Sequence, residues 1–141
     1  MSSAYESADL LLRLYELRRE DTLRKARAWF GSFQPASAQE IVDTIRGEHS
    51  AYYRMVTTYW EMAAAMVNHG AIDEPMFRDA NGEYLVVFAK VEPFLAEYRT
   101  LMRAPQYLHQ LEQLILRIPD HKERLAAVRE RMKQMAAARP T

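Results

Sequence analysis

The clearest signal in the pattern of hydrophobic and polar positions is a helix end followed directly by a helix start, at residues 68–75. Gly70 can adopt the left-handed conformation that ends many helices, and Ile72 can fold back on the last helical turn. Asp73 can then cap a new helix, with an acidic residue and a proline in its favoured first turn. This junction predicts helices that pack antiparallel against each other.

The helix that ends at this junction carries the longest amphipathic pattern of the chain. A capping box at residues 37–40 begins it. Its expected core positions alternate in steps of four and three, with one polar member: Ile41, Ile45, Glu48, Tyr52, Met55, Tyr59, Met62 and Met66. Unbroken, this helix is about 46 Å long, whereas a compact domain of this length has a radius of gyration of only about 14 Å. Either the molecule is elongated or the helix bends, and Gly47 is the expected position of the bend.

A first helix is expected at about residues 7–30. Its apolar stripe, which we expect to face the core, consists of Ala8, Leu12, Tyr15, Leu23, Ala26, Phe30 and Phe33. Arg19 and Thr22 interrupt this stripe. The charged residues between its members alternate in sign, which is typical of a solvent-exposed outer face.

The segment after the junction predicts shorter helices. Residues 84–88 have strand propensity, but we interpret them as helix because their apolar positions continue one helical face to Met102. Pro93 must kink this helix or restart it. A fifth helix is expected from Pro105 to Ile118, followed by a last helix that begins near Asp120.

The last helix has a narrow apolar seam, formed by Leu125, Val128, Met132 and Met135. Two apolar residues per heptad suit coiled-coil contacts better than a broad core face. We therefore expect this helix, or the first one, to mediate self-association.

The predicted fold class is all-α: an antiparallel bundle of about five long helices plus one short helical turn, in a single domain over residues 1–141. Residues 1–6 and 137–141 are expected to fray. Hydrophobic residues make up 49% of the chain and charged residues 27%, which is near the average for a soluble globular protein.

Charge and composition exclude several classes of function. Nineteen Lys and Arg residues balance nineteen Asp and Glu residues, so no net field favours nucleic acid or acidic lipid. The chain has no cysteine, which excludes disulfides and Cys-based metal sites. Its first residues do not resemble a signal peptide, and no apolar run approaches the ~20 residues of a membrane span. We expect a cytoplasmic protein that binds neither nucleic acid nor membrane.

The sharpest candidate for a binding site is the pair Glu48 and His49, with Tyr52 and Tyr59 on the following turns. A carboxylate in the seam of a helix must be paired or protonated, so a ligand site in the bundle core is one interpretation. A structural ion pair, or a bend that turns Glu48 to solvent, is the alternative. No histidine has a glutamate three residues before it, as a bundle metal site requires, and we predict no catalytic residues, no metal and no cofactor.

Residues 59–77, from an aromatic-Glu-apolar helix through Gly70, Ile72 and Asp73 to a short helix, resemble a family of bacterial helical domains of unknown function. The resemblance extends through Tyr98 and Arg99 to the helix at residues 107–114, about residues 40–118 in all. It supports the helical fold and implies no catalytic residues.

Three hypotheses for function follow. The first is a protein–protein interaction or scaffolding module, a homo-oligomer or a binder of another protein. The second is a sensory or regulatory bundle that binds a small molecule near Glu48, His49 and Tyr52. The third is an enzyme of unknown class, for which no residues form a recognisable site.

Overall fold

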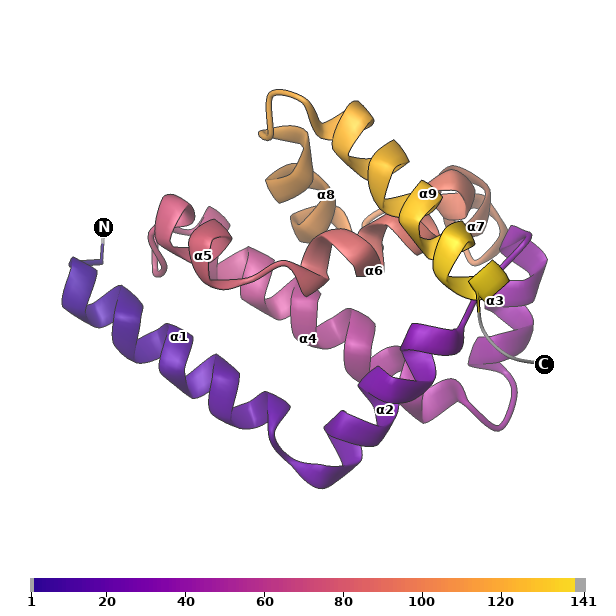
Figure 1. The fold of residues 1–141 in the computed structure, drawn as a ribbon, viewed down its shortest axis with the longest axis horizontal. Helices are drawn as coiled ribbons and strands as arrows, with labels where there is room; N and C mark the ends of the chain where they lie inside the picture. The colour runs from indigo at the N-terminus through magenta and orange to yellow at the C-terminus, as the bar shows by residue number, and fades with distance from the viewer. Residues whose placement is uncertain (1, 139–141) are drawn as a thin grey trace.

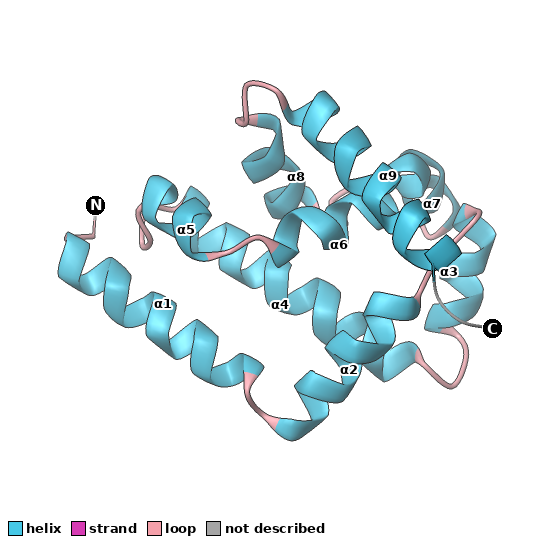
Figure 2. Cartoon of the chain, in the orientation of Figure 1, coloured by secondary structure: helices cyan, strands magenta, loops and turns pink. Residues whose placement is uncertain are grey.

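The computed structural model describes residues 2–138, and every regular element in that range is a helix (Figures 1 and 2). The α-helices are α1 (Ala4–Arg18), α2 (Asp21–Ser32), α3 (Ala38–Ile45), α4 (Ser50–Asn68), α5 (Glu74–Ala80), α6 (Glu83–Val91), α7 (Leu95–Leu101), α8 (His109–Leu116) and α9 (His121–Ala138). A 3-10 turn, η1 (Glu92–Phe94), joins α6 to α7. The predicted all-α class is confirmed, but the helices are shorter and more numerous than predicted.

Helix α4 runs through the middle of the molecule (Figure 1). It packs against α2 on one side and α8 on the other. Its residues Tyr53, Trp60 and Ala63 are almost completely buried. Helices α1 and α2 form a V beside it, whereas α6, α8 and α9 lie on the opposite side in the same view. The molecule therefore has one apolar core built around α4.

The predicted first helix is two helices. The chain turns at Arg19 and Glu20, and the Glu20 carboxylate accepts hydrogen bonds from the backbone N–H groups of Thr22 and Leu23 to start α2. Glu20 thus caps α2. It lies at the point where the apolar stripe is interrupted.

Residues 4–6, in the range expected to fray, form the first turn of a helix in the structure. Helix α1 begins at Ala4, because Ser3 and Glu6 form a reciprocal capping box. The backbone N–H of Ser2 also donates to the carbonyl of Gly70 at 3.1 Å. At the other end, α9 continues to Ala138, and residues 139–141 lie outside the described range.

The apolar stripe predicted for the first helix divides at the same turn. Its α2 members Leu23, Ala26 and Phe30 are buried as predicted. In α1, however, Leu12 is 68% exposed and Tyr15 is 54% exposed. Because α1 is a separate helix, it turns a different face to the core, and Leu12 and Tyr15 face outward.

Ser7 and Leu14 form the buried face of α1. The Ser7 hydroxyl is completely buried and accepts a hydrogen bond from the backbone N–H of Asp73 at 3.0 Å. This contact ties α1 to the start of α5. A buried serine at an otherwise apolar position explains why the sequence pattern favoured the wrong face.

The predicted second helix is also divided. Helix α3 ends at Ile45 and α4 begins at Ser50, so the expected bend at Gly47 is a complete break. The heptad register cannot be continued through a turn, and the Glu48 side chain is 88% exposed. Of the two interpretations of Glu48, the structure has the one in which the chain bends near Gly47 and turns Glu48 to solvent; the heptad position in the core seam does not hold.

The helix end at Gly70 has the geometry that the sequence predicts. Gly70 has a φ of 82°, and the N–H groups of Gly70 and Ala71 donate to the carbonyls of Val67 and Met66. These two bonds form a Schellman motif, which satisfies the last carbonyls of α4. Ile72 folds back and is 1% exposed, and the Asp73 carboxylate caps α5 through the N–H of Met76.

Residues 84–88 lie within α6, which confirms the helical interpretation. Pro93 sits in the 3-10 turn and restarts the helix as α7. Helix α8 begins at His109 rather than near Pro105, because Leu108 has a left-handed φ of 55° that no helix continues through. In the described part of the chain, no helix combines the length and apolar character that crossing a bilayer requires.

Candidate functional site

The residues predicted to form a ligand site lie in two separate places. His49 stacks on Trp29 of α2, with ring centroids 5.1 Å apart, and Tyr52 lies beside the same indole ring. Glu48 is in the preceding turn, with its carboxylate 4.0 Å from His49. Glu48 and His49 line an open hollow of about 390 Å³ together with Glu40, Asp43, Thr44 and Gly47. The other two predicted residues, Tyr52 and Tyr59, are absent from this lining.

Tyr59 points instead toward α1. Its hydroxyl is buried and donates a hydrogen bond to the backbone carbonyl of Leu14. Burial raises the pKa of Tyr59 to about 12, although the nearby charges of Arg18 and Arg27 act in the opposite direction. The Tyr59 hydroxyl therefore links α4 to α1, and Arg18 of α1 and Arg27 of α2 lie nearby.

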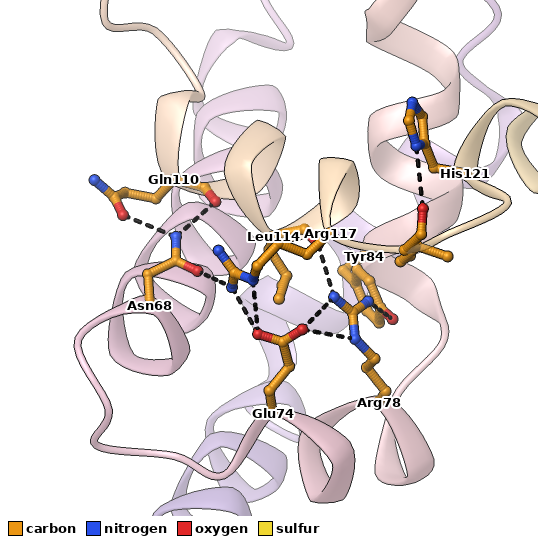
Figure 3. Close-up of polar contacts among 9 residues, drawn as sticks. Asn68, Glu74, Arg78, Tyr84, Gln110, Leu114, Arg117 and His121 are labelled. Carbon is orange, nitrogen blue, oxygen red and sulfur yellow. Dashed lines mark hydrogen bonds and ion pairs between the residues drawn. The ribbon is translucent and has the colours of Figure 1, made fainter. Parts of the chain in front are cut away.

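A polar cluster fills the junction between α4, α5 and α8 (Figure 3). Its centre is Glu74, whose two carboxylate oxygens accept from Arg117 and Arg78 at 2.7 Å each. Arg78 also donates to the carbonyl of Leu114 at 2.7 Å, at the end of α8. Asn68 joins the cluster by accepting from Arg117 and by donating to Gln110. Every member of the cluster thus has a protein partner.

The protonation of Glu74 follows from these contacts. Burial raises the pKa of the Glu74 carboxyl, but the hydrogen bonds from Arg117 and Arg78 lower it by more. The carboxyl is therefore held below its ordinary pKa and stays ionised in the folded protein.

A second carboxylate holds the other end of α8. Glu61 of α4 accepts from the backbone N–H of Leu111 at 2.7 Å and of Gln110 at 3.0 Å. These N–H groups belong to the first turn of α8, which Leu108 at the cap position leaves without a side-chain cap. Three polar residues of the segment at residues 59–77, namely Glu61, Asn68 and Glu74, thus help to position α5 and α8.

Most of the seam predicted on the last helix is buried against other helices of the same chain. Leu125 and Val128 are 3% exposed each, on the helix that packs against α6. Met132 is partly buried against the same core, whereas Met135 is 64% exposed. The expectation that all four residues form an intermolecular seam is therefore wrong for Leu125 and Val128.

An apolar groove of about 360 Å³ lies between α1 and α5. Its lining residues are Ala8, Leu11, Leu12, Tyr15, Arg18, Met76, Ala80 and Asn81. Ala8, Leu12 and Tyr15, with Tyr5 one turn earlier, follow a three-four-three spacing on the side of α1 away from Leu14. We call these four residues the α1 stripe; Tyr5 is 84% exposed.

A second hollow, of about 460 Å³, lies at the corner between α1 and α2. Tyr15, Arg18, Arg19, Arg24 and Arg27 line it, and we call it the arginine hollow. The sequence did not reveal this site, because the arginines alternate with acidic residues along the chain. Only the turn at Glu20 brings the arginines of the two helices together.

Among the residues that the structure describes, no three His, Asp or Glu side chains are grouped closely enough to hold a metal ion.

Comparison with known proteins identifies a family. A family model described as a domain of unknown function, DUF4760, matches residues 3–118. No curated protein and no solved structure matches the chain. The match confirms the resemblance predicted for about residues 40–118 and extends it through α1 and α2. Helix α9 lies beyond the matched residues.

Proposed function

The chain belongs to the DUF4760 family, and on that premise we propose that it is a protein-interaction module that pairs with a second copy of itself through the α1 stripe. The observation that carries this proposal is the exposure of Leu12, at 68%, beside Tyr15 in an apolar groove. Single exposed apolar residues are common on protein surfaces, but a continuous apolar stripe next to a groove is typical of an interaction site.

The spacing of the stripe suits another helix. Residues 5, 8, 12 and 15 alternate in steps of three and four, as the a and d positions of a coiled coil do. These positions lie on one side of α1, while the opposite side packs against the body through Leu14. The helix therefore has one face for the core and another for a partner.

The stripe is also complementary to itself. When two α1 helices pair antiparallel with Tyr5 opposite Tyr15 of the second copy, the same register sets Ala8 opposite Leu12 of the second copy. A small residue then faces a large one in both central layers, which allows close packing. The two-fold symmetry of this arrangement is the commonest symmetry of soluble oligomers.

The expected affinity is modest. A helix of 15 residues offers about two heptads, extended by Met76 and Ala80 of α5 at the groove. Such a contact lies at the small end of specific interfaces, so we expect a weak, concentration-dependent association.

Disulfide trapping tests the proposed register, because the chain contains no cysteine. The variants Ala8→Cys and Leu12→Cys are mixed and oxidised mildly, with Leu17→Cys as the matched control. Leu17 is 52% exposed on the same helix but lies outside the stripe. The proposal expects a covalent dimer from the Ala8 and Leu12 variants that forms faster than any dimer of the Leu17 variant. Equal rates of cross-linking would contradict it.

A further inference from the structure

The arginine hollow has the size of a small-molecule site. Its volume of about 460 Å³ falls within the range of roughly 300–1,000 Å³ that ligand pockets occupy. The end of α1 supplies Arg18 and Arg19, and α2 supplies Arg24 and Arg27. Because two helices contribute, the shape of the hollow depends on the fold and is not that of a single charged helix face.

The positive charge of the lining is only partly balanced. Glu83 of α6 pairs with Arg27 at 2.9 Å and lies 3.8 Å from Arg18. The carboxylate of Glu20, which is near in sequence, is already held by the N–H groups of Thr22 and Leu23. Even with the charges of Glu83 and Glu20 both counted, the four guanidinium groups leave an excess of positive charge at the hollow.

The guanidinium of Arg18 is fixed in place without using its hydrogen-bond donors. It lies 5.3 Å from the ring centroid of Tyr15 and 5.5 Å from that of Trp60. Its Nε atom is buried and makes no hydrogen bond to any residue that the structure describes. Ring contacts and one long ion pair hold the group at the hollow, and in the described chain no acceptor forms a hydrogen bond with its side-chain N–H groups.

Arg19 and Arg24 provide further donors at the hollow. Within the described part of the chain, neither side chain takes part in an ion pair or a hydrogen bond. The hollow thus combines two positioned arginines, Arg18 and Arg27, with two adaptable ones.

From this arrangement we infer that the arginine hollow binds a small soluble molecule that carries a phosphomonoester or pyrophosphate group. Guanidinium forks match the spacing of phosphate oxygens and bind them through paired, charge-assisted hydrogen bonds. A phosphomonoester presents three terminal oxygens and a charge of nearly −2, whereas a carboxylate presents two oxygens and a charge of −1, so the phosphate group matches several arginines better. Tyr15 belongs both to the α1 stripe and to the lining of the hollow, but the four arginines that would hold the phosphate lie outside the stripe. The inference therefore does not require the pairing of α1 stripes.

Titration calorimetry with inorganic pyrophosphate, in magnesium-free buffer, tests this inference. The wild-type protein is compared with the double variant Arg19→Gln/Arg24→Gln. The matched control is Arg124→Gln/Arg131→Gln, which removes the same charge from exposed positions of α9. Circular dichroism checks that all three proteins are folded, and Leu12→Glu tests whether binding is independent of the α1 stripe.

The inference predicts saturable binding to the wild type, the control and Leu12→Glu. The Arg19/Arg24 variant should bind at least about tenfold more weakly, because it loses charge-assisted hydrogen bonds. The absence of binding to the wild type, or equal weakening in the α9 control, would overturn the inference. Binding only to vesicles that contain phosphatidic acid would assign the arginines to a membrane surface and would overturn it too.

Discussion

Glu61 caps a helix to which it does not belong: its carboxylate on α4 accepts the backbone N–H of Leu111, in the first turn of α8, at 2.7 Å. The adjacent N–H of Gln110 donates to the same carboxylate. The charge of the carboxylate also complements the positive end of the α8 dipole. The core thus depends on a polar contact between residues 50 positions apart in the sequence.

Glu61→Ala should therefore destabilise the fold. The substitution leaves two partly buried N–H groups without an acceptor, and we expect the free energy of unfolding to fall by about 1–2 kcal/mol. Urea unfolding followed by circular dichroism measures the change, with the exposed Glu97→Ala as the control. If both substitutions cost the same small amount, Glu61 does not hold α8.

The Glu74 cluster should make stability depend on pH. The pKa of Glu74 in the folded protein lies below its ordinary value of 4.5, since Arg117 and Arg78 outweigh the effect of burial. The unfolded chain then binds more protons than the folded one as the pH falls through 4.5 toward the folded pKa. The stability that this carboxylate contributes is present above that range and is lost below it.

Glu74→Gln should remove this contribution. At neutral pH we expect a loss of about 1–2 kcal/mol, because Arg78 and Arg117 remain without their common carboxylate. Below about pH 4 the difference between the variant and the wild type should shrink. Thermal unfolding at several pH values, with Glu130→Gln as an exposed control, checks both statements. A difference that stayed constant across the pH range would rule out the assigned role of the charge.

The two ends of the α9 seam should respond differently to truncation. Leu125 is buried, so Leu125→Ala should cost about 2–4 kcal/mol through the cavity that it leaves. Met135 is exposed, and Met135→Ala should change stability by no more than about 0.5 kcal/mol. Chemical denaturation measures both changes. A loss of oligomer mass in Leu125→Ala without a loss of stability would restore the intermolecular interpretation of the seam.

The sequence predicts the structure correctly where interactions between neighbouring residues determine it. Gly70 and Asp73 determine a helix end and a helix start through their own backbone and side-chain preferences, and both were predicted correctly. The helical state of residues 84–88 followed from apolar periodicity, and the effect of Pro93 from its missing N–H group.

The errors arose where one register was extended through a turn. Glu48 was placed in the core by counting heptads through Gly47, and Leu12 and Tyr15 by counting through Arg19. At each point the helix ends, and the next helix presents a face that the preceding pattern does not determine. Glu20 was a possible signal, because an acidic residue can cap the helix that follows it.

The polar sites could not be deduced from one sequence. Glu61 and Gln110, or Arg18 and Arg24, are brought together by the tertiary fold. Their residue types are common on solvent-exposed helix faces, so composition and spacing alone do not distinguish a cap or a binding site from ordinary surface.

The central claim, that the α1 stripe pairs two copies of the chain, is tested most directly by sedimentation velocity. Wild-type protein, Leu12→Glu and Leu17→Glu are compared over a concentration series that spans roughly tens of micromolar. The proposal predicts a concentration-dependent dimer for the wild type and for Leu17→Glu, and a folded monomer for Leu12→Glu. A wild-type monomer at every concentration, or a dimer that Leu12→Glu leaves intact, would contradict it.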